Sequence, residues 1–366
     1  MSILHTEWSD GWGGQERRII SDLAGMAGRG HRVFLVTRPH CRIGEEARQA
    51  GIPVFYLPMR SILDLASAVR LAAILHKEQI EIVNTHSGVD RWVGGLAAKL
   101  AGTPVLIRTR HLHLPLKRSW SNFIHYLPDR IVPSGESTRN LLVQECGFSD
   151  DKVISIPTGI NFSGFTPCRS RAQVRAELGL PQDAFVILMA GIIRSVKRHE
   201  VALRAMAQLS TRIGSSYLIL AGDGPLTESM KQLAEEVGIV DKVIFLGYRN
   251  DIADLMGAAD CLLLTSRSEG APQAVTQALG AGLPVVATAV GGVPELVHDR
   301  RTGLLVPAED VTGITNALEY IFQHPEEAKE LARQGREHAR SHYSLEAMLE
   351  RTELEYQTLL EERTQS

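Results

Sequence analysis

The chain has 366 residues, of which 44% are hydrophobic and 22% are charged, with a net charge of −3. This composition is typical of a globular protein and excludes an intrinsically disordered chain, while the length favours two domains over one. The four cysteines lack the spacing of a metal site or a disulfide framework. No apolar run reaches the roughly 18 residues of a membrane span and no signal segment opens the chain, so a cytoplasmic protein is expected.

The charge is divided unevenly along the chain. Residues 1–169 hold 20 Lys and Arg against 15 Asp and Glu, a net +5, whereas residues 170–366 hold 19 against 27, a net −8. A basic first half favours peripheral contact with an anionic surface, such as the inner face of a membrane. Scatter over two ordinary protein surfaces explains the same numbers, and no nucleic-acid partner is expected.

Short β-branched runs alternate with amphipathic segments through the first half of the chain. The helical pattern is clearest over residues 15–28 and 61–77. The predicted strands are 3–7, 32–37, 53–57, 82–85, 105–109, 130–133 and 153–156. Strands alternating with helices of this length indicate βαβ units and a parallel sheet.

The pattern pauses at a polar stretch, residues 161–171, and then starts again. The strands predicted after it are 185–190, 217–221, 243–246, 261–264, 284–287 and 303–306. A restart after a linker predicts a second doubly wound domain. We therefore place the first domain at residues 1–165 and the second at 171–344, followed by a long helix at 345–362.

Ligands of open parallel sheets bind beyond the carboxyl ends of the strands, so candidate site residues are expected in the loops that follow strands. After the first strand, Gly13 and Gly14 precede a helix, whose free N–H groups and positive dipole end favour a phosphate. The third glycine and the acidic residue of the dinucleotide fingerprint are missing. A tight turn without a ligand fits this segment as well.

The second half repeats the arrangement. Gly191 follows a predicted strand and opens a loop that contains Arg194 and Lys197, two cations suited to charge-assisted bonds with phosphate. Asp223 and Gly224 follow the next strand, again in a glycine-rich turn. Two solvated cations are the alternative interpretation of the first loop.

The most informative stretch is residues 265–282. Glu269 follows a strand, Pro272 is predicted to be the first residue of a helix, Gln277 lies about two turns along it, and Gly282 is its expected C-cap. A carboxylate at the start of this helix can accept hydrogen bonds from sugar hydroxyls. An anionic helix cap would use the same residue without a ligand.

Six segments, taken in order, resemble the retaining glycosyltransferases of family 4. They are Gly13-Gly14-Gln15-Glu16, Gly191 to Lys197, Gly222-Asp223-Gly224-Pro225, Ser268-Glu269-Gly270, Gly282 to Ala287, and Gly291-Gly292-Val293-Pro294-Glu295. The likeness spans the whole chain and is most specific over residues 185–307. It implies the GT-B fold, an α/β architecture of two Rossmann-like doubly wound domains facing across a cleft, with residues 345–366 crossing back to the first domain.

The resemblance also implies which residues hold the sugar and phosphates of a donor. Lys197 matches a phosphate-binding lysine and Glu269 a glutamate that hydrogen-bonds the donor sugar. The backbone of Gly270, Ala271 and Pro272 matches the loop beneath that sugar.

Two further loops and one histidine follow from the same resemblance. Gly13 and Gly14 match a loop near the donor phosphates, and Asp223 and Gly224 match a loop on the nucleotide side. His111, which follows a predicted strand, matches a histidine close to the reacting sugar.

The chain departs from the family pattern at two positions. Gln277 stands where the family has a second glutamate that holds the ribose hydroxyls, and a neutral amide makes weaker bonds than a carboxylate. Ile192 stands where the family often has an arginine, a charge that Arg194 is placed to supply.

The implied activity is the retaining transfer of a sugar from a UDP- or GDP-linked donor, with no cofactor. The chain has no Asp-x-Asp pair, so we expect cations and helix ends instead of a metal to stabilise the leaving diphosphate. The expected acceptor is a saccharide or glycolipid of the cell envelope, such as lipopolysaccharide. The alternatives are a catalytically impaired nucleotide-sugar-binding protein and a UDP-sugar epimerase of the same fold.

A basic and aromatic stretch in the first half is the candidate contact with a glycolipid headgroup or membrane surface, although an ordinary surface loop has the same composition. Its residues are His111, His113, Lys117, Arg118, Trp120 and Phe123.

Overall fold

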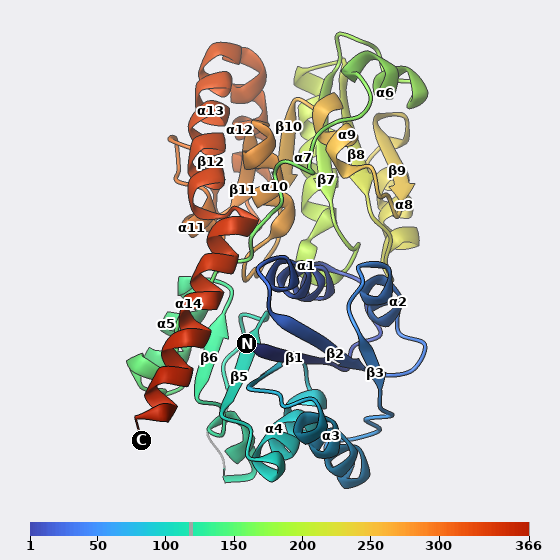
Figure 1. Cartoon of the computed structure of the whole chain (residues 1–366). Helices are drawn as coiled ribbons and strands as arrows, with labels where there is room; N and C mark the ends of the chain where they lie inside the picture. Colours follow the sequence, from blue (N-terminus) through green and yellow to red (C-terminus); the bar gives the residue numbers. More distant parts are fainter. Residues whose placement is uncertain (117–119, 366) are drawn as a thin grey trace. The chain divides into compact units, whose positions relative to one another are not determined.

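The computed structural model describes residues 1–116 and 120–365, which form two compact units (Figure 1). The first unit comprises Met1–Gly159 with Leu345–Ser366, and the second comprises Ile160–Ser344. Within the described residues, each unit is built on one sheet of six strands whose pairings are all parallel.

The first sheet has the spatial order β3-β2-β1-β4-β5-β6. Its strands are β1 (Ser2–Glu7), β2 (Arg32–Thr37), β3 (Val54–Tyr56), β4 (Ile82–Thr85), β5 (Val105–Arg110) and β6 (Arg130–Pro133). The helices of this unit are α1 (Gly14–Gly28), α2 (Arg42–Gln49), α3 (Leu65–Lys77), α4 (Asp90–Ala101), α5 (Glu136–Asn140) and α14 (Leu345–Thr364), with short turns η1 (Trp120–His125), η2 (Leu141–Glu145) and η3 (Asp150–Lys152).

Successive side chains of each strand point to opposite faces of the sheet, so the apolar side chains of this unit form two cores. Ile3 packs in a cluster with residues of α1, α2 and α14, whereas its neighbour Leu4 packs with residues of α3 and α4 on the opposite face. Figure 1 shows α1 and α3 on opposite sides of β1 and β2. The last helix therefore completes the core of the first unit, where the Tyr356 ring is buried.

The second sheet has the order β12-β11-β10-β7-β8-β9. Its strands are β7 (Phe185–Ala190), β8 (Ser216–Ala221), β9 (Val243–Gly247), β10 (Cys261–Leu264), β11 (Val285–Thr288) and β12 (Leu304–Val306). The helices are α6 (Arg171–Glu177), α7 (His199–Arg212), α8 (Thr227–Glu236), α9 (Ile252–Ala258), α10 (Gln273–Ala281), α11 (Val293–Leu296), α12 (Val311–Gln323) and α13 (Pro325–His342), with turns η4 (Ser195–Lys197) and η5 (Val240–Lys242).

Both sheets reverse their strand order at one point, between β1 and β4 in the first and between β7 and β10 in the second. In doubly wound folds, the loops that leave the two strands at this point diverge and leave room for a ligand. Two Rossmann-like domains are thus confirmed, and their reversal points single out the loops after β1, β4, β7 and β10.

Residues 153–156 were predicted as a strand, which is wrong. Val153 forms a single bridge with Ile131, and Ile156 N–H donates to the carbonyl of Pro133 at 3.0 Å. Proline has no N–H to donate in return, so the ladder cannot continue on β6.

The boundary between the units also differs from the expected one at residue 165. Residues 160–165 belong to the second unit, because Ile160 N–H donates to the carbonyl of Tyr343 at 2.9 Å. The ring of Phe162 lies so close to Gly280 that a Cβ there would approach it to 1.9 Å. Apolar contacts thus extend the second unit into the polar stretch predicted as a linker.

Candidate active site

In the second unit, the loop after β7 lies directly against the loop after β8. Gly191 N–H donates to the carbonyl of Ala221, and Ile193 N–H to that of Asp223, both at 3.0 Å. A Cβ at Gly222 would stand 1.8 Å from the carbonyl oxygen of Gly191, so only glycine allows this approach. The two glycine-rich segments predicted from sequence therefore form one surface at the carboxyl ends of the strands.

Lys197 and Glu269 meet at the reversal point of the second sheet. Lys197 lies at the end of η4 and Glu269 in the loop after β10, and Nζ of the lysine is 2.6 Å from Oε1 of the glutamate. Both side chains are largely buried, with 17% and 11% of their surface exposed. The two side chains thus satisfy each other in a partly desolvated ion pair, which a polar ligand would have to open to reach either charge.

The backbone around Glu269 is held on several sides. Ser266 Oγ donates to Glu269 Oε1 at 2.5 Å, and Gly292 N–H donates to the Glu269 carbonyl at 3.1 Å. Gly291, with φ of +52°, packs its α-carbon against the same carbonyl, and a Cβ there would stand 2.0 Å from the oxygen. Arg267 N–H donates to the Val196 carbonyl at 2.9 Å, which joins this loop to the one that contains Lys197.

The helix after this loop begins one residue later than predicted. Pro272 is the N-cap of α10, with ψ of 106°, and Gln273 is its first residue. Gly282 is the C-cap in the left-handed conformation, as predicted. Gln277 is half-buried on this helix.

The remaining donor-side residues lie at the same edge of the second sheet. Arg194 and Ile192 are exposed, and Gly270 and Ala271 are half-exposed in the loop that leads to α10. Ile192 has 45% of its surface exposed, which places an apolar side chain at a position suited to a charge.

Asp223 and Gly224 lie where β8 leads into α8. The Asp223 carboxylate accepts from Gly224 N–H at 2.7 Å and from Thr227 Oγ1 at 2.8 Å, and the bond from Thr227 lowers the pKa of Asp223. A cavity of about 370 Å³ opens beside them and extends to Phe245 and Gly247 at the end of β9. It is roughly large enough for a nucleoside fragment.

The helix that follows the glycine loop of the first unit is capped by one of its own side chains. Gly13 is the N-cap of α1, and its N–H donates to the buried Glu16 carboxylate at 2.8 Å. A phosphate at this helix end would have to displace a carboxylate that already occupies it. Gly14 is the first residue of the helix.

His111 directly follows β5 and is half-buried. Its Nε2 is 3.1 Å from Nδ1 of His86, and Nε2 of His86 is 3.1 Å from Nδ1 of His5. Burial, assisted by the positive charge of Arg18, lowers the pKa of His111 well below its usual range, so the ring is neutral.

Sequence reasoning did not single out the ionisable residues at the ends of β1 and β4. His5 and Glu7 lie within buried β1, and His86 follows β4. Burial, with the Asp90 carboxylate nearby, raises the pKa of Glu7 to about 7, and its carboxyl accepts from Ser9 N–H at 2.7 Å. Ionisable residues in a strand that is expected to be buried are the signal that would have identified His5 and Glu7.

Of the other members of the basic and aromatic stretch, the structure describes the side chains of His113 and Phe123. His113 Nδ1 is 3.1 Å from Thr138 Oγ1, and the ring of Phe123 packs edge-on against Trp92. Lys117 and Arg118 lie outside the described residues.

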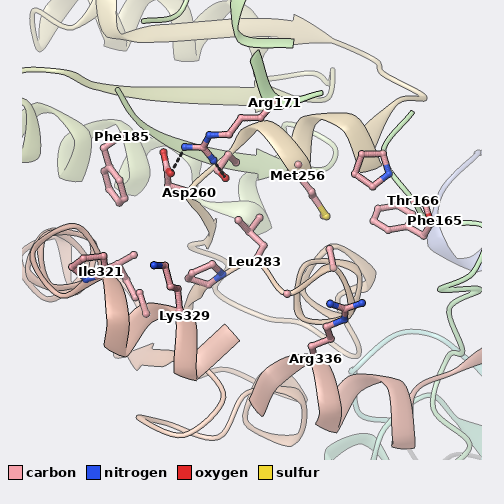
Figure 2. Close-up of a pocket in the computed structure, with 18 of the residues that line it drawn as sticks. Phe165, Thr166, Arg171, Phe185, Met256, Asp260, Leu283, Ile321, Lys329 and Arg336 are labelled. Atoms are coloured by element: carbon pink, nitrogen blue, oxygen red, sulfur yellow. Dashed lines mark hydrogen bonds and ion pairs between the residues drawn. The ribbon is translucent and has the colours of Figure 1, made fainter. Parts of the chain in front are cut away.

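A larger cavity, of about 530 Å³, lies at the opposite, amino end of the second sheet. Figure 2 shows that Arg171 and Asp260 pair across one wall, with Lys329 and Arg336 on another. None of the predicted site residues lines it, and doubly wound sheets bind ligands at the other end. We therefore place the site at the Lys197–Glu269 pair.

No helix in residues 1–116 or 120–365 is both long and apolar enough to span a bilayer.

Comparison with known proteins identifies the family of the chain. Residues 170–338 match the family described as glycosyl transferases group 1, and residues 12–163 match glycosyltransferase family 4. A UDP-Gal:alpha-D-GlcNAc-diphosphoundecaprenol alpha-1,3-galactosyltransferase of Escherichia coli is 27% identical over 290 residues, covering 75% of each chain. A D-inositol 3-phosphate glycosyltransferase of Saccharomonospora viridis is 30% identical over 77% of this chain and 71% of the relative.

Among solved structures, HepE of Anabaena in complex with UDP and glucose superposes with a TM-score of 0.87 at 20% identity, covering 98% of this chain and 100% of the other. The two Rossmann-like units and these family matches together identify a glycosyltransferase of the GT-B fold. The chain belongs to glycosyltransferase family 4.

Proposed function

We propose that this enzyme transfers a sugar, with retention of configuration, from a UDP- or GDP-linked donor to a saccharide or glycolipid acceptor. The observation that carries the proposal is the Lys197–Glu269 pair at the reversal point of the second sheet. It sets a cation suited to a phosphate beside a carboxylate suited to sugar hydroxyls. A diphosphate sugar offers a ligand to each of these two groups.

In the proposed reaction, the bond between the anomeric carbon and the diphosphate breaks while the acceptor oxygen attacks from the same face. The acceptor proton passes to the departing phosphate oxygen, so no protein nucleophile is required. Lys197, Arg194 and the main-chain N–H groups of the loop after β7 stabilise the negative charge that develops. The backbone of Gly270, Ala271 and Pro272 lies beneath the sugar.

The nucleoside part is assigned to the cavity beside Asp223 and Gly224, at the ends of β8 and β9. Phe245 lines this cavity and offers an aromatic surface to a base. The acceptor is assigned to the first unit beside His111, where Leu112 and Leu114 have 58% and 55% of their surface exposed. Exposed apolar side chains next to a candidate catalytic group suit a lipid-linked acceptor, and hence cell-envelope synthesis.

Changing Gln277 to glutamate should raise donor affinity several-fold if residue 277 faces the ribose. A carboxylate accepts bonds from two vicinal hydroxyls, and charge-assisted bonds exceed neutral ones by about 1 kcal/mol. Calorimetric titration with ribo and 2′-deoxy nucleoside diphosphates measures the effect. Gln357→Glu, at an exposed position of α14 in the first unit, is the matched control. An equal gain with the deoxy ligand, or none with either, would show that Gln277 does not contact the ribose.

A panel of nucleotide sugars, incubated with and without saccharide and lipid-linked acceptors, tests the proposed function. Acceptor-dependent release of nucleoside diphosphate in the presence of EDTA is expected for one or a few donors. Donor binding without turnover would indicate the impaired binding protein, and interconversion of the donor without release would indicate an epimerase. Loss of activity in EDTA that Mg²⁺ restores would contradict the metal-free mechanism.

A further inference from the structure

Three imidazole rings form a continuous buried chain in the first unit. His5 Nδ1 is 3.1 Å from His86 Nε2, and His86 Nδ1 is 3.1 Å from His111 Nε2. Nε2 of His5 is in turn 3.4 Å from the hydroxyl of Tyr356, on the last helix. This histidine chain thus links the half-buried ring of His111 to a residue near the end of the sequence.

The orientation of Asn84 fixes the proton at one end of this chain. Thr109 N–H, which can only donate, lies 3.1 Å from Asn84 Oδ1. The amide nitrogen of Asn84 therefore faces the other way and donates to the Tyr356 oxygen at 3.1 Å. Because that oxygen accepts from Asn84, the hydroxyl proton of Tyr356 is free to point at Nε2 of His5.

A neutral imidazole that accepts at one nitrogen carries its proton on the other. His5 accepts at Nε2, so its proton is on Nδ1 and is donated to Nε2 of His86. The same rule places the proton of His86 on Nδ1, from where it is donated to Nε2 of His111. His111 then has its own proton on Nδ1, the ring nitrogen that forms no bond to the other two histidines.

All three rings are neutral, as this ordering requires. Burial, with the charge of Arg18, lowers the pKa of His5 to about 3. Burial also lowers the pKa of His86 and of His111 well below the usual range, and Arg108 adds to both effects.

Asp22 is the group that would favour the reverse order, because its carboxylate would attract a proton on Nε2 of His5. Its Oδ2 is 3.9 Å from that nitrogen, beyond hydrogen-bond distance, whereas the Tyr356 oxygen is nearer at 3.4 Å. Burial raises the pKa of Asp22 to about 6 in spite of Arg18, so the comparison rests on these two distances. Tyr356, and not Asp22, therefore decides which nitrogen of each histidine ring carries the proton.

We propose that Asn84 and Tyr356 order the histidine chain so that His111 presents an Nδ1–H donor to a substrate oxygen. Tyr356 is thus a positioning residue that acts through His5 and His86. The ordering follows from the contacts in the first unit, whereas its use in catalysis rests on the proposed function.

The ring nitrogens of the full chain, labelled with [¹⁵N]histidine, report the tautomers by long-range ¹H–¹⁵N correlation. The wild type should show a protonated Nδ1 on His5, His86 and His111. Tyr356→Phe removes the donor, and Asn84→Asp draws the hydroxyl proton away, so both should shift His111 toward Nε2–H. Tyr56→Phe, at an exposed tyrosine of β3, is the matched control and should change nothing. A wild-type His111 protonated on Nε2 would overturn the proposal.

Kinetics separate positioning from a general loss of structure. Tyr356→Phe should lower kcat about tenfold or more with donor KM unchanged, since a wrong tautomer removes a bond without removing a binding site. In a His111→Ala background, the same change should have no further effect. An additional loss there would mean that Tyr356 acts only on stability and would overturn its positioning role. Correct tautomers in a chain without transferase activity would instead refute the proposed function and leave the ordering intact.

Discussion

Replacing Glu269 with alanine should lower the rate of sugar transfer about 10- to 150-fold, the equivalent of losing a 1.5–3 kcal/mol hydrogen bond to a charged group. The loss should fall on kcat, because the carboxylate contacts the sugar and not the nucleotide. Binding of the nucleoside diphosphate should be retained or improved, since Lys197 loses its partner at 2.6 Å and becomes free for phosphate. Steady-state kinetics and calorimetric titration of the same samples measure both quantities.

Glu326→Ala is the matched control for this substitution. Glu326 is a glutamate that also pairs with a lysine, Lys329, but it lies on α13 and is 82% exposed. It should behave as the wild type in both assays. If Glu269→Ala weakened nucleotide binding as strongly as it slowed transfer, Glu269 would not be a sugar-binding residue.

Replacing Lys197 with alanine should weaken nucleoside diphosphate binding by about 1.5–3 kcal/mol, or 10- to 150-fold in Kd, and leave binding of the nucleoside alone nearly unchanged. The phosphate loses a charge-assisted donor, and the unpaired Glu269 carboxylate adds repulsion. Titration with the diphosphate and with the nucleoside measures the difference. Lys329→Ala, at a 71% exposed lysine beside the other cavity, is the control and should have no effect.

The double variant Lys197→Ala with Glu269→Ala separates the two causes of this loss. If Lys197 contacts phosphate, the double variant still binds the diphosphate more weakly than Glu269→Ala alone. Affinity restored to the level of Glu269→Ala would mean that the single variant suffered only from repulsion, and Lys197 would not be at the phosphate.

The strands were predictable because most are short apolar runs, often β-branched, bounded by turn residues, and parallel pairing buries both of their faces. Residues 153–156 have the same composition but face Pro133 on the neighbouring strand. Only the pairing partner reveals that the ladder must stop there. The extent of the linker was misjudged for a similar reason, since the contact of Phe162 with Gly280 is not visible in a local pattern.

The loops of the candidate site could be predicted because strand ends at a reversal point are fixed by topology. The pairing of Lys197 with Glu269 could not, because it depends on contacts between loops 72 residues apart and on a left-handed Arg198, with φ of +53°. The bond between Gly13 N–H and Glu16 could have been predicted from the sequence, since a glutamate three residues after an N-cap is a known pattern. The link from Tyr356 to His5 spans 351 residues and only folding reveals it.

Hydrogen–deuterium exchange of the full chain, with and without UDP and GDP, tests the central claim most directly. The account predicts that a bound nucleotide slows exchange in residues 191–199, 222–228 and 265–274, the three loops that meet at the carboxyl ends of β7, β8 and β10. Slowed exchange confined to residues 165–171, 281–284 and 325–336, around the cavity of Figure 2, would place the nucleotide at the opposite end of the sheet and contradict it.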